Sequence, residues 1–191
     1  MQNFEKTKID ILNKKDKSFK SSIDEKILNL CNIINEKKSL FTLSSCSGRI
    51  CILECINKNN KKLSNWLIVD HFLANFEEFE KKLFEFSGEN KLYFRQESAI
   101  LHICVKDLEL AEKIIIISKK SGFNKCSILS TKSKISVEII CALPLISPIY
   151  DKNILITKEY LKYLISEANE KQKYSWDCIK KLENEINLNF E

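Results

Sequence analysis

The sequence predicts an α+β protein: one mixed β-sheet built from a duplicated α/β unit, with a long C-terminal helix. Three observations predict it. Apolar residues at helical spacing change to strand patterns after residue 40, and the order helix-strand-strand is then followed by strand-helix-strand-strand. The stretch 157–187 contains neither Gly nor Pro and carries an apolar stripe. A chain of 191 residues suits a single domain over residues 1–191.

The first helix is predicted after an irregular N-terminal segment, residues 1–21. Ser22 and Glu25 have the spacing of a capping box, in which the side chain of each residue accepts a hydrogen bond from the backbone N–H of the other. The apolar residues that follow recur every three or four positions: Ile23, Ile27, Leu30, Cys31 and Ile34. This spacing predicts one buried helical face.

Apolar and β-branched runs predict strands at 41–43, 49–56 and 66–69, with a polar hairpin loop at 57–64. An aromatic stripe at helical spacing predicts a helix over 72–86. Further strands are predicted at 92–94, 99–105, 128–129 and 135–141, and Asp107 caps a helix that ends before Gly122. Pro144 and Pro148 are expected to end the sheet, and the C-terminal helical region, 157–187, either crosses the sheet or breaks near Lys171.

Composition excludes several classes of protein. With 44% hydrophobic and 30% charged residues the chain is not disordered, and no apolar run approaches the ~18 residues of a membrane span. Three glycines cannot form the dinucleotide fingerprint, so a Rossmann fold is not expected, nor is a P-loop. The N-terminus lacks a secretory signal, and the eight cysteines include no CxxC pair. We therefore expect a cytoplasmic protein with buried thiols and no metal, whose net charge of +5 permits nucleic acid as a partner.

The most distinctive feature is the SSCSGR motif between two predicted strands: Ser44, Ser45, Cys46, Ser47, Gly48 and Arg49. Small side chains let the backbone N–H groups of such a turn point inward, where they can hold a carboxylate or phosphate. Arg49 adds a bidentate donor. A polar strand-to-strand turn without a ligand explains the same residues equally well.

The motif resembles the signature of the tRNA wybutosine-synthesizing protein 3 family. Similar segments occur in order from about residue 16 to 182: Asp16-Lys17-Ser18-Phe19-Lys20, Ile23-Asp24-Glu25, Trp66 to His71, Glu97 to Ile103, Gly122-Phe123, Tyr160, and Ala168-Asn169-Glu170-Lys171. The family has a Ser where this chain has Asp70, and a Pro where it has Ser98. Two family arginines are replaced by Asn124 and Ile140.

The resemblance implies S-adenosylmethionine-dependent N-methylation of a 4-demethylwyosine-type base next to the anticodon of phenylalanine tRNA. It implies that the SSCSGR motif holds S-adenosylmethionine. Residues implied to contact the tRNA are Asp16, Lys17, Ser18, Lys20 and Lys125. A base that removes the proton of the attacking ring nitrogen would assist the reaction, and the candidates are His71, Asp70, Glu97 and His102.

Other interpretations remain open at this stage. His102 is flanked by Leu101 and Ile103, which is typical of a hydrogen-bonded core histidine. Loss of the two arginines favours an alternative, a non-catalytic RNA-binding module that keeps the fold. A thiol-dependent enzyme that uses Cys46 is a third hypothesis, although we expect Cys46 to line the pocket. Trp66 and Phe123 are the candidates for stacking on the RNA base. The sequence carries no prediction of oligomeric state.

Overall fold

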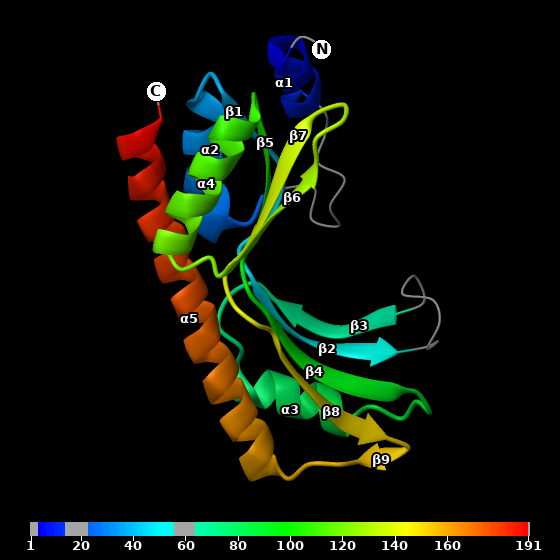
Figure 1. The fold of residues 1–191 in the computed structure, drawn as a ribbon. Helices are drawn as coiled ribbons and strands as arrows, with labels where there is room; N and C mark the ends of the chain where they lie inside the picture. The colour runs from blue at the N-terminus through cyan, green and yellow to red at the C-terminus, as the bar shows by residue number, and fades with distance from the viewer. Residues whose placement is uncertain (1–3, 14–22, 56–63, 191) are drawn as a thin grey trace. The chain divides into compact units, whose positions relative to one another are not determined.

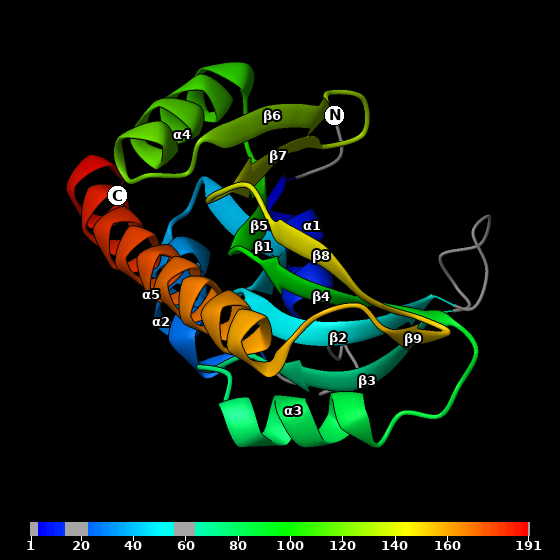
Figure 2. The same cartoon turned by 90° about the horizontal axis from the view of Figure 1, so that it is seen from below.

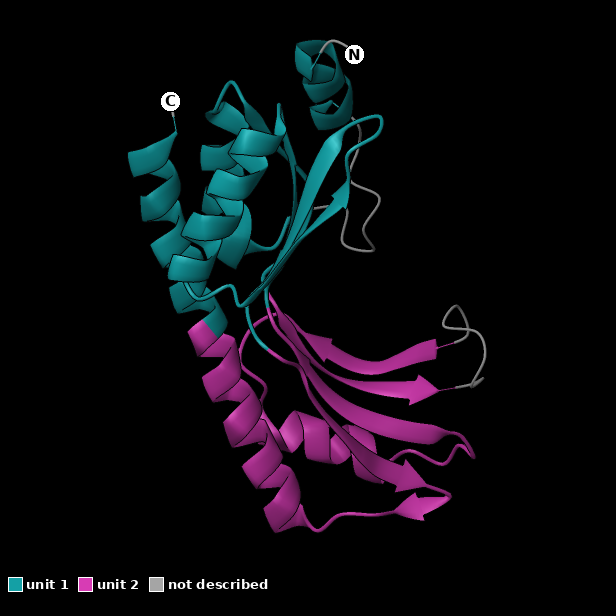
Figure 3. Cartoon of the chain, in the orientation of Figure 1, with its two compact units in different colours: residues 1–47, 99–142, 175–191 teal, residues 48–98, 143–174 magenta. Residues whose placement is uncertain are grey.

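A computed structural model describes residues 4–13, 23–55 and 64–190. The chain forms two compact units, which Figure 3 shows in different colours. Unit 1 consists of residues 1–47, 99–142 and 175–191, and unit 2 consists of 48–98 and 143–174. The chain passes between the units four times, so neither unit is a continuous segment. The assignment of residues 1–191 to a single domain therefore stays a prediction.

Unit 1 contains a four-stranded antiparallel sheet in the order β1-β5-β7-β6. Its elements are α1 (Phe4–Leu12), α2 (Glu25–Glu36), β1 (Leu40–Cys46), β5 (Ile100–Val105), α4 (Leu108–Lys120), β6 (Lys125–Ser130), β7 (Ile135–Ile140) and the C-terminal part of α5 (Lys158–Asn189). Alternate strand residues, such as Leu101 and Ile103, form one core with the apolar faces of α2, α4 and α5. Figure 1 shows these helices on one side of the sheet.

Unit 2 contains a five-stranded antiparallel sheet in the order β3-β2-β4-β8-β9. Its elements are β2 (Arg49–Cys55), β3 (Ser64–Asp70), α3 (Phe76–Phe84), β4 (Lys91–Glu97), β8 (Leu145–Asp151), β9 (Asn153–Ile154) and the N-terminal part of α5. Ile52 and Phe94 belong to a second core, which includes Phe79 of α3 and Leu161 of α5. Figure 2 shows α3 along the face of the sheet that carries this core.

The α+β class and the long C-terminal helix are confirmed. The strands, however, form two sheets rather than the single mixed sheet that was predicted, and every strand pair in the described residues is antiparallel. The reason is that β1 and β2, joined only by Ser47 and Gly48, pair with different strands: β1 with β5, and β2 with β3 and β4. Alternation of apolar and polar side chains predicts a strand but does not predict which strand pairs with it. Duplication of the α/β unit stays a prediction.

The N-terminal segment is a second correction, because Phe4–Leu12 forms α1 where an irregular segment was predicted. The isolated Phe4 packs on Phe41 of β1, with ring centroids 5.3 Å apart, so a tertiary contact stabilises a helix that has no apolar stripe of its own. The residue that precedes α2 is Asp24, and Ser22 lies outside the described residues, as do 14–21 of the N-terminal segment and 57–63 of the predicted hairpin loop.

The prolines do not end the sheet, because β8 contains Pro148. Pro148 pairs with Tyr93 of β4, beside a register shift. On the other side of β8, the two-residue strand β9 pairs only with Tyr150 and Asp151, so Pro148 lies at an edge of the sheet. A proline is tolerated at such an edge because the missing N–H leaves no ladder bond unmade. Helix α5 runs without a break through Lys171. None of the helices in the described part of the chain has the length and apolar character that a membrane crossing requires.

Candidate active site

The SSCSGR motif is more regular than the turn that its composition predicts. Strand β1 continues through Cys46, so that only Ser47 and Gly48 connect it to Arg49, the first residue of β2. The first four motif residues belong to unit 1, and Gly48 and Arg49 belong to unit 2.

In unit 1 the end of the motif already holds a carboxylate. The backbone N–H and the hydroxyl of Ser47 both donate to Oδ2 of Asp24, at 2.9 and 3.2 Å. The Asp24 side chain makes no capping bond to α2, although Asp24 precedes this helix. Ser47 thus holds a carboxylate of the chain itself, and the ligand-binding turn stays a prediction.

In unit 2 Gly48 has a backbone that requires glycine. Its φ of +97° is strained for other residues, and a Cβ would lie 2.7 Å from Oε1 of Gln172 and 3.0 Å from the carbonyl oxygen of Glu97. Gln172 is buried and receives a hydrogen bond from Gln96, at 3.3 Å. Both the conformation and the close approach of α5 therefore exclude a side chain at position 48.

A row of three polar side chains crosses the sheet of unit 1, and we call it the histidine row: Ser44, His102 and Glu138. Ser44 pairs with His102, and His102 with Glu138, across β1, β5 and β7. Oγ of Ser44 lies 2.6 Å from Nδ1 of His102, and Nε2 of His102 lies 2.9 Å from Oε2 of Glu138. The core-histidine interpretation is wrong, because 27% of the His102 side chain is exposed and its neighbours Leu101 and Ile103 are the buried ones.

The histidine row has the chemistry of a proton acceptor. An ionised carboxylate only accepts hydrogen bonds, so Glu138 selects the tautomer with the proton on Nε2. Nδ1 then accepts the hydroxyl proton of Ser44, and the Ser44 oxygen keeps its lone pairs for a donor from outside. A proton given to Ser44 can pass to His102, where Glu138 stabilises the resulting imidazolium.

In unit 2 the base candidate Glu97 is held by two guanidinium groups. Its Oε2 accepts from Nε and Nη2 of Arg49, at 2.7 and 2.6 Å, and its Oε1 is 3.0 Å from Nη2 of Arg95. We call these three residues the arginine cluster. The guanidinium of Arg49 also lies over the ring of Trp66, 4.5 Å from its centroid. Both carboxylate oxygens of Glu97 are thus occupied by guanidinium groups, and this geometry favours a binding role for Glu97.

The other two base candidates lie at the end of β3 in unit 2: Asp70 is its last residue, and His71 follows it. Oδ1 of Asp70 accepts the backbone N–H of Phe72, at 2.7 Å, which closes an Asx turn. The backbone carbonyl of His71 accepts from Nε2 of Gln172, at 3.3 Å. Asn169, one turn earlier on α5, bonds both backbone groups of Ala74, at 2.8 and 3.1 Å. Helix α5 thus fixes the segment that carries His71.

The residues predicted to contact tRNA are only partly described. Lys125 is exposed at the start of β6, opposite Ile140. Outside the described residues lie Asp16, Lys17, Ser18 and Lys20. Phe123 is fully buried and cannot stack on a base, which corrects one prediction, whereas Trp66 is 40% exposed.

The cysteines are free thiols, and five of the eight are buried, as the sequence predicts. Burial raises the pKa of Cys31 to about 11 and the pKa of Cys51 to about 12. Both thiols stay protonated at neutral pH and act as small apolar side chains. Cys46, the candidate nucleophile, is half-buried in β1.

Two residues of these clusters escaped the sequence analysis. Glu138 has no local signal, because only pairing of β7 with β5 brings it to His102. Arg95 did have a signal: of the 31 lysine and arginine residues, only Arg49 and Arg95 are arginines.

The family described as Methyltransferase TYW3 matches residues 5–188 of the chain. The chain belongs to the Methyltransferase TYW3 family. The resemblance carried by the SSCSGR motif and the segments around it is therefore confirmed. The solved structure of the PH1069 protein from Pyrococcus horikoshii is similar over 97% of this chain and 96% of its own, with a TM-score of 0.89 and 30% identity.

Relatives with curated names support the membership in the Methyltransferase TYW3 family. A protein of Methanocaldococcus jannaschii named tRNA(Phe) 7-((3-amino-3-carboxypropyl)-4-demethylwyosine(37)-N(4))-methyltransferase is 35% identical over 167 residues, which cover 86% of each chain. The tRNA wybutosine-synthesizing protein 3 homolog of Danio rerio is 32% identical over 173 residues, which cover 88% of this chain and 68% of that protein.

Proposed function

We propose that this chain methylates a ring nitrogen of the tricyclic 4-demethylwyosine-type base beside the anticodon of phenylalanine tRNA, with S-adenosylmethionine as the methyl donor. The name of the Methanocaldococcus jannaschii relative states this methyl transfer to tRNA(Phe), and family membership extends over residues 5–188. The observation in the structure that best supports the reaction is the histidine row, because the SSCSGR motif begins at a hydroxyl already bonded to a histidine.

The cofactor is proposed to lie against the SSCSGR motif: Ser44, Ser45, Cys46, Ser47, Gly48 and Arg49. One feature of the motif suits a charged molecule: the guanidinium of Arg49 has more N–H donors than Glu97 occupies. When bound, S-adenosylmethionine supplies the methyl group on a positively charged sulfur.

The residues of this chain are proposed to orient the base and to take its proton. Ser44 accepts a hydrogen bond from the ring N–H, which aligns the nitrogen, and the proton moves through Ser44 to His102. His71 and Asp70 remain proposed catalytic residues in the segment that α5 fixes. Glu97 is proposed to have a binding role, as the carboxylate that Arg49 and Arg95 share.

The tRNA is proposed to bind through positive charges that meet its phosphates. Lys125 is the described candidate, together with Asp16, Lys17, Ser18 and Lys20 from the resemblance. Trp66 is exposed and can stack on an unpaired base. A cytoplasmic location belongs to the same proposal, and fractionation of cells with an antibody against the chain tests it.

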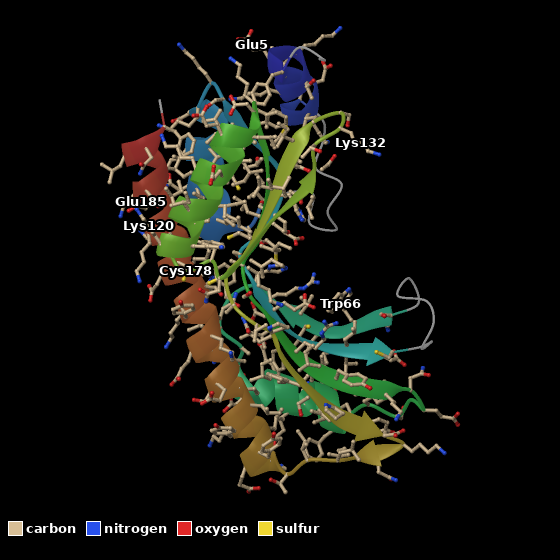
Figure 4. The ribbon with its side chains drawn as sticks, viewed as in Figure 1. Glu5, Trp66, Lys120, Lys132, Cys178 and Glu185 are labelled. Atoms are coloured by element: carbon tan, nitrogen blue, oxygen red, sulfur yellow. The ribbon has the colours of Figure 1, made fainter. Side chains whose placement is uncertain are left out.

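The decisive experiment incubates the purified full chain with S-adenosylmethionine and phenylalanine tRNA that carries the unmethylated tricyclic base. Mass spectrometry of the digested tRNA should show the addition of one methyl group to that base. His102→Gln should slow the addition at least about 100-fold, the scale of general base catalysis. Lys132→Gln, on the turn after β6 that Figure 4 labels, serves as a control that should keep the wild-type rate.

An unchanged mass of the base would contradict the proposal. Calorimetry with S-adenosylmethionine then separates the alternatives, since a chain that binds tRNA but no cofactor is the non-catalytic RNA-binding module. Full activity of Cys46→Ala would eliminate the thiol-dependent enzyme.

A further inference from the structure

A concave surface lies wholly within unit 2, on the face of the sheet opposite α3. Strand β4 alternates: Leu92, Phe94 and Gln96 are buried against the core, whereas Lys91, Tyr93, Arg95 and Glu97 face the other way. With residues of β2, β3 and β8 they line a cavity of about 870 Å³. In Figure 4 the side chain of Trp66 stands on this side of the sheet, away from α3.

Both arginines of the chain line this cavity. Arg49 and Arg95 come from neighbouring strands, and both guanidinium groups end on the same carboxylate, Glu97. The other 29 basic residues of the chain are lysines, so this sequence uses lysine wherever a positive charge suffices. Arginine at both positions of one cluster indicates that the planar, forked geometry of the guanidinium is needed there.

The arginine cluster carries an excess positive charge and spare donors. Two guanidinium groups face one carboxylate, so one positive charge is left over. Nε of Arg95 is buried and has no hydrogen-bond partner among the described residues, and it lies beside Nη2, which bonds Glu97. An unmet buried donor costs roughly 1–3 kcal/mol, which an arriving oxygen acceptor would recover.

The cluster is also held in place before any ligand arrives. The ring of Trp66 supports the guanidinium of Arg49 by a cation-π contact. Cys51 pairs with Arg95 across the strands and is fully buried, so the strand floor beneath the guanidinium groups is closed to water. At the other end of the cavity Lys91 and Asp151 neutralise each other, at 2.6 Å. Glu89 also lines the cavity, so its three cationic and three anionic side chains balance overall, and the positive excess at Arg49 and Arg95 is local.

We propose that this cavity binds a 3-amino-3-carboxypropyl group, with the carboxylate on Arg95 and Arg49 and the ammonium on Glu97. The proposal rests on the proposed function, in which two molecules carry this group. S-adenosylmethionine has it as its amino acid tail, and the base in the names of the relatives has it as a side chain. Arg95 is thereby a binding residue for one of these two tails, and Trp66 is a positioning residue that supports Arg49.

The charges of the cluster favour this zwitterion over an RNA phosphate. A phosphate would balance the spare positive charge of the guanidinium groups, but it has no N–H donor for the remaining lone pairs of Glu97. The amino acid group presents a negative and a positive charge on one carbon. It can therefore use the spare donors of Arg95 and the remaining lone pairs of Glu97 together.

The test compares ligands that differ in this group alone, on wild type, Arg95→Gln and Arg95→Lys. Calorimetry measures S-adenosylhomocysteine against 5′-methylthioadenosine, which lacks the amino acid tail. A second arm measures anticodon stem-loop RNAs whose tricyclic base has or lacks the 3-amino-3-carboxypropyl group. Lys132→Gln removes one positive charge from the exposed turn after β6 and serves as the matched control.

In each arm we compare the affinity for the ligand that has the 3-amino-3-carboxypropyl group with the affinity for the ligand that lacks it. One of these two affinity ratios should fall about tenfold or more in both Arg95 variants, because lysine keeps the charge but lacks the forked guanidinium geometry. A fall in the first arm assigns the cavity to the cofactor, and a fall in the second assigns it to the base. The proposal is overturned if both ratios equal those of wild type in variants that melt cooperatively. It is also overturned if Arg95→Gln weakens both RNAs by the same factor, which indicates a phosphate contact.

Failure of the proposed function looks different. In that case wild type transfers no methyl group to either RNA, whatever the affinity ratios are. A ratio that still depends on Arg95 would keep the cavity as an amino acid site in a protein with another activity.

Discussion

Leu43 determines to which face of the sheet the side chain of Ser44, the first residue of the SSCSGR motif, points. Strand β1 has a register shift between Thr42 and Ser44, so that Leu43 is the extra residue of a β-bulge. Thr42 pairs with the core-facing Ile103, and Ser44 pairs with His102 on the opposite face. Without the extra residue, Ser44 would share the core face with Thr42. The bulge therefore creates the histidine row.

Glu138 is expected to act through His102, as a positioning residue. Glu138→Gln keeps the shape of the side chain but can no longer stabilise an imidazolium. We expect kcat for methyl transfer to fall about 10- to 100-fold, with KM for tRNA nearly unchanged, because the residue is not expected to contact the substrate. Glu112→Gln, exposed on α4, is the matched control. Equal kcat values for the two variants would show that the row carries no proton.

Gly48→Ala is expected to destabilise the chain by about 2–4 kcal/mol, the sum of a left-handed backbone and an overlap with neighbouring atoms. Thermal melting measures the loss. Part of it comes from Oε1 of Gln172, 2.7 Å from the added carbon, so Gln172→Ala should relieve that part. The double variant should therefore be more stable than the sum of the single effects predicts. Strict additivity would mean that the backbone conformation alone requires glycine.

Helix α5 is the element that supports the candidate site in unit 2. Asn169 and Gln172, one turn apart on one face of the helix, hold the backbone at Ala74 and at His71. The aliphatic residues Leu161, Leu164 and Ile165 of the same helix pack into the unit 2 core. Burial of that apolar face fixes the rotation of the helix, and this in turn directs the two amides to the segment after β3.

Asn169→Asp tests this support. The carboxylate can still accept the N–H of Ala74 but cannot donate to its carbonyl, so one half-buried acceptor loses its partner and faces a negative charge. We expect a loss of about 1–3 kcal/mol in the free energy of unfolding, measured in urea. Asn184→Asp makes the same chemical change at an exposed position of α5 and should lose a few tenths of a kcal/mol at most. Equal losses would refute a specific role for Asn169.

The charge of the whole molecule leads to a prediction about tRNA binding. The net charge is +5, carried almost entirely by lysines spread over the chain. Each phosphate contact releases counterions, so tRNA affinity should fall at least about tenfold between about 50 and about 200 mM salt. Filter binding measures it. The affinity for S-adenosylhomocysteine, which is bound by paired charges, should change little over the same salt range. If the tRNA affinity is equally insensitive to salt, lysine-phosphate contacts are excluded.

Local patterns predicted most helices and strands because each signal lies within a few residues. Asp107 caps α4 through the N–H of Leu110, at 2.9 Å, and Gly122 has the expected positive φ of +102°. The apolar stripe after residue 157 became one helix, α5. Elements that depend on distant contacts were missed: α1 needs Phe41, and β8 needs the partner strand β4.

By itself, the sequence determined the α+β class, the family and the SSCSGR motif, because periodicity, capping residues and a rare short motif are local properties of the chain. Only the tertiary structure decided which strands pair, that Glu138 meets His102, and that both arginines meet on Glu97. The physical reason is that pairing partners are selected by the burial of whole sheet faces, and a single bulge or a two-residue connection redirects every side chain that follows it.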